Sequence, residues 1–277
     1  MTYEEIMDVQ KRKKNIRIYQ IYEIIAIDLL FYYSTIFLFY INQKQLLNYQ
    51  ILLIDTSYIF FKLLFYMFSQ VCIQKYGKRN MLILGNIFVL ASLIILLGFK
   101  SVIAFLISAA LCALGFDLKE LCESNLLYDS LIKTDRRSEN FSKIESKVSS
   151  KYYIIETLSC LVSGFLYVLN PYIPICLCIG ITTLCLIIST QFQDIKKEEN
   201  IKGLKEEYIE LKHSLKSISR SKRIMSLLVI NAFFIGMYTI YNTLRNVVLL
   251  RVGVAERNFG VIFAIRNIYF FNMYKIF

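Results

Sequence analysis

The chain has 277 residues, of which 56% are hydrophobic, and its mean hydropathy is +0.51. Only 19% of the residues are charged, below the ~25% typical of soluble domains, and they cluster between long apolar runs. This excludes an ordinary soluble domain and indicates a polytopic all-α membrane protein, since a helix that crosses a bilayer needs ~20 mostly apolar residues.

Apolar runs long enough to cross a bilayer recur along the whole chain. In order they cover residues 18–41, 50–73, 81–99, 102–126, 152–169, 172–192, 224–244 and 258–275, the last being the weakest. No small-residue cleavage site follows a short apolar core near the start, so we expect a retained first helix rather than a removed signal peptide.

The segments and the charged stretches between them predict four parts. These are a basic cytosolic arm (1–17), a six-helix transmembrane bundle (18–192), a charged cytosolic linker (193–223) and an incomplete second bundle of two helices (224–277). Within the linker, residues 195–216 carry Glu among Lys and predict an amphipathic surface helix.

The distribution of Lys and Arg predicts the orientation in the membrane. Cytoplasmic loops carry an excess of these residues. With the N-terminus inside, most of them fall on the inner side, whereas the outer connections among the first six segments hold only Lys44 and Lys100. Topology therefore accounts for the net charge of +11, and we expect no nucleic-acid partner.

Neither a metal site nor an enzyme is indicated. The seven cysteines lie in or beside apolar segments without a C-x-x-C pair, which is typical of apolar packing residues. The single histidine, His213, lies in the charged linker, where a solvated side chain is favoured over a ligand or base. No nucleotide-binding or hydrolase motif occurs, so we expect no cofactor and no catalytic residue.

Polar residues recur at helical spacing inside several apolar segments. In the second segment Asp55, Tyr58, Lys62, Tyr66 and Ser69 fall on one face of a helix. A charge at the centre of a membrane helix costs ~2.5–3.5 kcal/mol on insertion scales, so such residues face a protein interior or a wet cavity.

Similar stripes occur elsewhere, and two explanations stay open for them. They comprise Asp28, Tyr32 and Thr35 in the first segment; Glu156, Ser159, Ser163 and Asn170 in the fifth; and Asn231, Tyr238, Asn242 and Arg245 in the seventh. Hydrogen bonds between helices explain the Ser, Thr and Tyr members best. A shared pathway for solute or protons explains the charged members best.

The end of the fourth segment carries four charges within seven residues. On a helix Asp117, Glu120 and Ser124 share one face, which suits the inner mouth of a pathway. Lys119 and Glu123 share another face and are spaced to form a structural ion pair. The two roles are compatible.

Three stretches resemble a known family. They are GFDLKELCESNLLYDSLIK (115–133), QKYGKRNMLILGN (74–86) and LLRVGVAERNFGVIFAI (249–265). The first is similar to the acidic end of helix 4 in a bacterial branch of drug and solute exporters. The second matches the second half of the loop 2–3 signature, and the third is similar to the helix 7–8 connection. Over nearly its whole length the chain resembles a major facilitator superfamily transporter.

The resemblance implies a fold and a mechanism. We expect two six-helix bundles around a central cavity lined by helices 1, 4 and 7, working by alternating access. It also implies a conformational loop formed by Lys75, Gly77, Lys78 and Arg79 together with Asp129. Gln74 stands where the signature has Asp, and Gln70 where it has the first Gly, which departs from the family pattern.

The function expected from the resemblance is secondary transport of a small solute or drug across a bacterial cytoplasmic membrane. We expect a monomer, and the similarity to a branch of exporters suggests efflux. Protons are the candidate coupling ion, carried by Asp28, Asp117, Glu120 and Glu156, because buried carboxyls bind protons more readily. Twelve helices are expected and eight are found, so a truncated, non-transporting remnant is the alternative. A membrane enzyme or receptor would need a further domain, and none is indicated.

Overall fold

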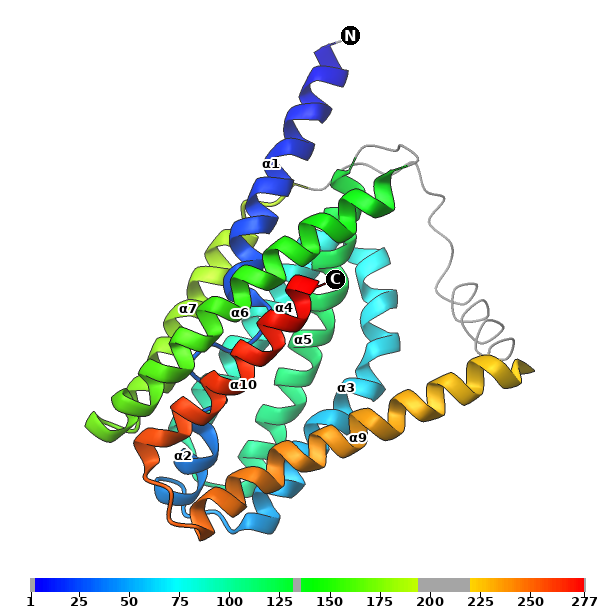
Figure 1. Cartoon of the computed structure of the whole chain (residues 1–277). Helices are drawn as coiled ribbons and strands as arrows, with labels where there is room; N and C mark the ends of the chain where they lie inside the picture. The colour runs from blue at the N-terminus through cyan, green and yellow to red at the C-terminus, as the bar shows by residue number, and fades with distance from the viewer. Residues whose placement is uncertain (1–2, 132–135, 194–219, 277) are drawn as a thin grey trace. The chain divides into compact units, whose positions relative to one another are not determined.

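The computed structural model describes residues 3–131, 136–193 and 220–276. Within these ranges every regular element is a helix, which confirms the predicted all-α class (Figure 1). The helices are α1 (Tyr3–Ala26), α2 (Ile36–Asn42), α3 (Asn48–Tyr76), α4 (Lys78–Gly98), α5 (Val102–Ser130), α6 (Arg137–Leu169), α7 (Ile173–Ser189), α9 (Lys222–Arg251) and α10 (Glu256–Ile276). The predicted linker helix and His213 lie outside the described residues.

Apolar helices of bilayer length are present. By length and composition α3, α4, α5 and α6 can each cross a membrane, and α7 is apolar but shorter, with 17 residues. Of the eight predicted segments, the second to the fifth therefore meet this criterion among the described residues. The chain is a multi-pass membrane protein.

The first predicted segment, 18–41, is not one helix. It is divided by an irregular stretch between the end of α1 at Ala26 and the start of α2 at Ile36. Within this stretch Phe31 has a φ of 67°, a left-handed conformation that costs a residue with a Cβ roughly 1–2 kcal/mol. A bulky residue held in this conformation marks a break that the surrounding fold maintains.

The helices form two compact units. One contains Met1–Lys197 with Ala255–Phe277, and the other contains Glu198–Val254, whose described element is α9. In the first unit α5 packs against α3 and α4, α1 contacts α5, α6 and α7, and α10 packs along α6 (Figure 1). The sequence grouped 224–277 as one bundle, whereas here α10 belongs with the first six segments.

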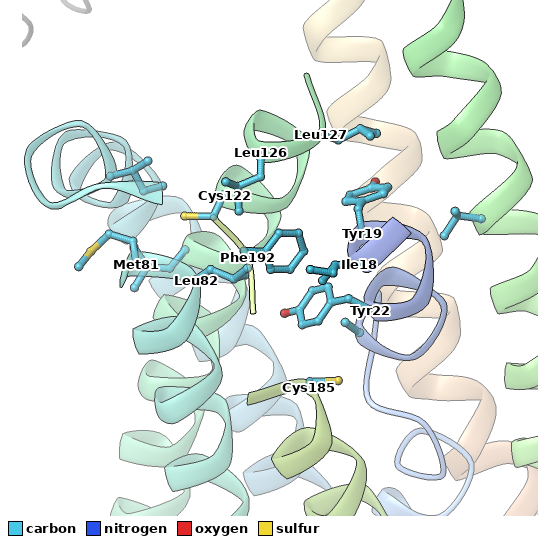
Figure 2. Close-up of a cluster of buried hydrophobic side chains, with 14 residues drawn as sticks. Ile18, Tyr19, Tyr22, Met81, Leu82, Cys122, Leu126, Leu127, Cys185 and Phe192 are labelled. Atoms are coloured by element: carbon cyan, nitrogen blue, oxygen red, sulfur yellow. The ribbon is translucent and has the colours of Figure 1, made fainter. Parts of the chain in front are cut away.

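A cluster of buried side chains fills one end of the first unit. Tyr22 of α1 and Phe192, just beyond α7, meet edge to face with ring centroids 5.7 Å apart. Figure 2 shows these rings pointing toward each other, with Leu82 of α4 and Cys122 of α5 beside them. The core therefore ties α1, α4 and α5 to the segment that follows α7.

Glycines allow two helix pairs to approach closely. A Cβ on Gly115 of α5 would lie 2.7 Å from Val89 Cγ2 and 2.8 Å from the Gly85 carbonyl oxygen of α4. A Cβ on Gly164 of α6 would lie 2.6 Å from the backbone oxygen of Arg257 in α10. Small residues are what membrane helices use to bring backbones together, because lipid supplies no hydrophobic drive for association.

One lysine closes the C-terminal end of α4. Lys44 is buried, and its Nζ donates to the carbonyl oxygens of Leu97 at 2.8 Å and Phe99 at 2.7 Å. The ammonium also lies over the rings of Phe39 and Phe105, 5.3 and 5.9 Å from their centroids. Burial lowers the pKa of Lys44, and so does the neighbouring Lys100. The connection between α2 and α3 is thereby anchored on α4.

Candidate functional site

The break in the first segment presents a carboxylate. Asp28 Oδ1 accepts hydrogen bonds from the Leu29 amide at 2.9 Å and from the Tyr33 hydroxyl at 2.8 Å. Both bonds come from within the break, so the side chain holds the irregular backbone in place. Predicted site residues Tyr32 and Thr35 lie in the same stretch, half-buried and buried respectively.

The end of α1 at this break is bonded to α5. A helix leaves its last four carbonyl groups without intrahelical partners. Lys119 is only 3% exposed, and its Nζ donates to the Ala26 carbonyl oxygen at 2.9 Å. The sequence offered Glu123 as the partner of Lys119, but the structure gives no ion pair between these two described residues. Lys119 instead joins α5 to the broken first segment.

An ion pair links α3 and α5. Lys62 Nζ lies 2.6 Å from Glu120 Oε1, and both side chains are partly exposed. These residues come from polar stripes that the sequence analysis identified separately on the two helices. Because both are ionic and lie inside apolar helices, we expect this side of the pair to face protein or water rather than lipid.

Asp117 is the most unusual of the predicted residues. It is 1% exposed, and neither of its carboxyl oxygens has a hydrogen-bond partner among the residues that the structure describes. Its predicted face-mates behave differently, because Glu120 pairs with Lys62 and Ser124 is exposed. An ionised carboxylate buried without a donor carries a large desolvation penalty, which binding a proton removes.

The remaining predicted pathway residues lie on α6 and α9. Glu156 of α6 is buried, and nearby on the same helix Ser163 bonds to Ser34 of the break. On α9, Asn231 is exposed and Arg245 is half-buried, while Tyr238 and Asn242 are described only by their place in the helix. Because α9 forms part of the second unit, the expected cavity lined by helices 1, 4 and 7 stays a prediction.

Three of the predicted loop residues, Lys78, Arg79 and Asp129, lie in a cluster of charges at the start of α4 and the ends of neighbouring helices. Lys78 forms an ion pair with Asp129 of α5, and Arg137 of α6 lies 4.0 Å from the same carboxylate. Arg79 donates to the Thr190 carbonyl oxygen at 2.7 Å, and Arg12 of α1 donates to the Asp129 carbonyl oxygen at 2.6 Å. Together these bonds tie the middle of α1 to the ends of α4, α5, α6 and α7.

Two other loop residues have different surroundings. Gly77 joins α3 to α4 with a φ of 88°, which glycine adopts without strain. Lys75 is exposed, with its ammonium 5.0 Å from the ring centroid of Tyr76. Lys75 therefore stands apart from the Asp129 cluster.

A second buried polar group was missed by the sequence analysis as a site. Glu23 Oε2 of α1 and Glu123 Oε1 of α5 are both shielded from solvent, and neither has a hydrogen-bond partner among the described residues. Nearby, Asn86 of α4 donates to the Tyr22 hydroxyl at 2.9 Å. The signal for Glu23 was one acidic residue in an apolar run, five positions before Asp28. Glu123 was interpreted as the ion-pair partner of Lys119, because the two residues are spaced four apart on a helix, and it was therefore not considered as a site residue.

Comparison with known proteins finds structural likeness only. No protein-family model matches the chain, and no curated protein matches it significantly. A mutant of the peptide transporter POT in complex with sulfate has a TM-score of 0.44 and 16% identity, covering 83% of this chain and 47% of that one. The same mutant without a named ligand gives 0.44 and 15%, covering 90% and 51%.

A third match is the POT mutant in complex with alafosfalin, with a TM-score of 0.41 and 16% identity, covering 87% of this chain and 53% of that one. The chain spans about half the length of the solved structures it matches.

Proposed function

We propose that the chain is part of a secondary transporter of the major facilitator type, which moves a small solute across the cytoplasmic membrane by alternating access coupled to protons. The observation that carries this proposal is the broken first segment with Asp28 at its centre. Discontinuous helices at mid-membrane are typical of transporter binding sites, because their unpaired backbone groups and side chains can bind solutes or ions.

The ionisable residues beside the break support proton coupling. Asp117 is buried without a hydrogen-bond donor, and Lys62 and Glu120 form an ion pair on the adjoining faces of α3 and α5. Charged residues are expensive inside a membrane and are retained mostly where they act on ions or substrates. In this proposal Asp28 and Asp117 carry protons, and Lys62 with Glu120 lines the pathway.

The Asp129 cluster supports the alternating-access part of the proposal. It ties α1 to the ends of α4, α5, α6 and α7 through one carboxylate and side-chain bonds to carbonyl oxygens. We propose that these bonds hold one conformation and break in the other, as expected of a conformational loop formed by Lys78, Arg79 and Asp129. We also propose that the N-terminus lies in the cytoplasm, as the basic residues predict.

The test is proton movement in proteoliposomes loaded with a pH-sensitive dye. A panel of neutral sugars, zwitterionic dipeptides and cationic amphipathic amines is added, and the internal pH is followed. We expect one class to change the internal pH, and Asp28→Asn or Asp117→Asn to abolish the change while the protein still inserts. Solute-driven pH changes that persist in both variants would remove the coupling role. Folded protein with no response to any class would favour the non-transporting alternative.

A further inference from the structure

Three lysines form a line on one face of α6, just before its apolar part. Lys143, Lys147 and Lys151 are exposed and follow one another at intervals of four residues, which places them on the same face of the helix. Lys143 forms an ion pair with Glu139, with 2.6 Å between Nζ and Oε1. Lys147 and Lys151 have no hydrogen bond or ion pair to any residue that the structure describes. Their ammonium groups are open to solvent.

The same face of α6 continues into the membrane as an apolar surface. With 3.6 residues per turn, Leu158 and Phe165 lie within about 40° of Lys151 around the helix axis. Their side chains are 57% and 56% exposed, as expected of residues that lipid chains cover. The contact with α10, at Cys160 and Gly164, lies on the far side of α6. The surface that faces lipid therefore leads directly to the lysines.

The length of α6 places two of the lysines at the level of the lipid headgroups. The helix has 33 residues and is about 50 Å long, whereas the hydrocarbon core is ~30 Å thick and the headgroups add ~5–8 Å on each side. The apolar segment begins at residue 152, so Lys151 lies at the edge of the hydrocarbon. Lys147 lies about 6 Å beyond that edge, within the headgroup layer, and Lys143 about 12 Å beyond it, outside the layer.

We propose that Lys147 and Lys151 bind the headgroup phosphate of an anionic phospholipid whose acyl chains lie along the exposed apolar face of α6. Opposite charge is the first reason, since lysines beside a membrane attract anionic lipids. The carboxylates of α6 do not compete on this face, because Glu145 lies about half a turn around the helix from Lys147 and Glu156 is buried.

A lipid fits this face better than a soluble acidic protein does. Such a protein could reach the ammonium groups of Lys147 and Lys151, but the apolar continuation of the face lies within the bilayer. A phospholipid has both an anionic headgroup and apolar chains, in the order that α6 presents their partners. This binding depends on α6 crossing the membrane and not on the proposed transport function.

The experiment uses the absence of Trp from the sequence. Leu158→Trp puts a single fluorescent reporter on the lysine side of the apolar face. Phe165→Trp is the matched control, because it lies on the same face of α6 but toward the opposite leaflet. Each full-length variant is reconstituted into phosphatidylcholine vesicles containing either brominated phosphatidylglycerol or brominated phosphatidylcholine, and the quenching of Trp emission is measured. We expect phosphatidylglycerol to be preferred about fivefold at Leu158→Trp, and not at Phe165→Trp.

The lysines themselves are tested in the Leu158→Trp background. Lys147→Gln combined with Lys151→Gln should abolish the preference for phosphatidylglycerol, and high salt should weaken it by screening. Lys11→Gln combined with Lys13→Gln is the matched control, since both lysines are exposed on α1 and the net charge changes equally. That control should keep the fivefold preference.

Three results would each overturn the proposal. The first is no preference for phosphatidylglycerol at Leu158→Trp, which would leave an acidic soluble partner as the alternative. The second is an equal preference at Leu158→Trp and Phe165→Trp, and this comparison stands even if the lysine variants do not fold. The third is a preference that survives the loss of both Lys147 and Lys151. Quenching requires no transport, so its outcome is separate from that of the proteoliposome assay.

Discussion

At the scale of single residues, several cationic side chains are bonded to backbone carbonyl oxygens at places where helices end or break. Lys44 closes α4, Lys119 closes α1, and Arg12 and Arg79 reach carbonyl oxygens at the ends of α5 and α7. In a bilayer an unsatisfied backbone group costs several kcal/mol, so these long cationic side chains supply donors that water cannot. The charges therefore support the fold as well as any pathway.

The first prediction concerns Asp129, where Lys78 and Arg137 converge. Asp129→Asn removes the negative charge but keeps the shape, so it should lower the free energy of unfolding by about 1.5–3 kcal/mol, the range for a hydrogen bond to a charged group. The measurement is thermal unfolding in detergent, followed by a thiol-reactive dye that reports exposure of buried cysteines such as Cys122 and Cys185.

The control for Asp129→Asn is Glu139→Gln. Glu139 and Lys143 are one helical turn apart and both side chains are more than half exposed, so losing this ion pair should barely change the free energy of unfolding. If both substitutions lower the unfolding temperature equally, the cluster around Asp129 contributes no more than an ordinary surface pair.

At the scale of helices, close packing depends on small residues placed at crossing points. Gly85 faces Gly115 where α4 meets α5, and Gly164 faces Gly260 where α6 meets α10. The second pair explains why α10 belongs to the first unit even though it follows α9 in sequence. The exposed apolar residues of α10, such as Ile265, lie on faces of the helix other than the one that carries Gly260.

The second prediction tests this packing. Gly115→Ala places a methyl group 2.8 Å from the Gly85 carbonyl oxygen, a backbone atom that moves only with its helix. We expect a loss of roughly 1–3 kcal/mol in unfolding free energy, as for overpacked cores. Gly180→Ala in α7 is the matched control, since nothing lies within 4 Å of its new Cβ, and it should be neutral or stabilising. Equal unfolding temperatures for the two variants would contradict the close approach.

The helices themselves were largely predictable, whereas the break and the contacts were not. Long apolar runs set the positions of α3 to α6 because bilayer thickness dictates their length. Residues 27–35 contain neither Gly nor Pro, so no local sequence signal predicts a helix break there. The break is maintained by tertiary hydrogen bonds, such as the one from Lys119 to the Ala26 carbonyl oxygen. Helical spacing placed Lys62 and Glu120 on polar stripes of their own helices. It could not show that these two stripes face each other and form an ion pair.

At the scale of the whole molecule, the basic residues predict which end of the bundle faces the cytoplasm. Lys13 is exposed on α1, whereas Cys176 is exposed in the first turn of α7, next to a connection predicted to lie outside. The Asp129 cluster lies with the basic ends of the helices. Orientation therefore decides on which side of the membrane these ion pairs must break.

The third prediction tests this orientation with a membrane-impermeant thiol reagent on intact cells. Native Cys176 should be labelled from outside. In a Cys176→Ser background, Lys13→Cys should be labelled only after the membrane is permeabilised. Labelling of Lys13→Cys in intact cells, with the wild type unlabelled, would reverse the topology and place the Asp129 cluster outside.

The broken first segment predicts where the backbone opens most readily. The amides of Tyr32 and Thr35 bond to carbonyls three residues back, at Leu29 and Tyr32, rather than four as in a regular helix. Shorter turns of this kind have poorer geometry and open more readily. In a hydrogen-exchange measurement we therefore expect the amides of residues 27–35 to take up deuterium well before those of α4 and α5. The first membrane segment would then consist of two stable helical parts, α1 and α2, joined by a flexible stretch.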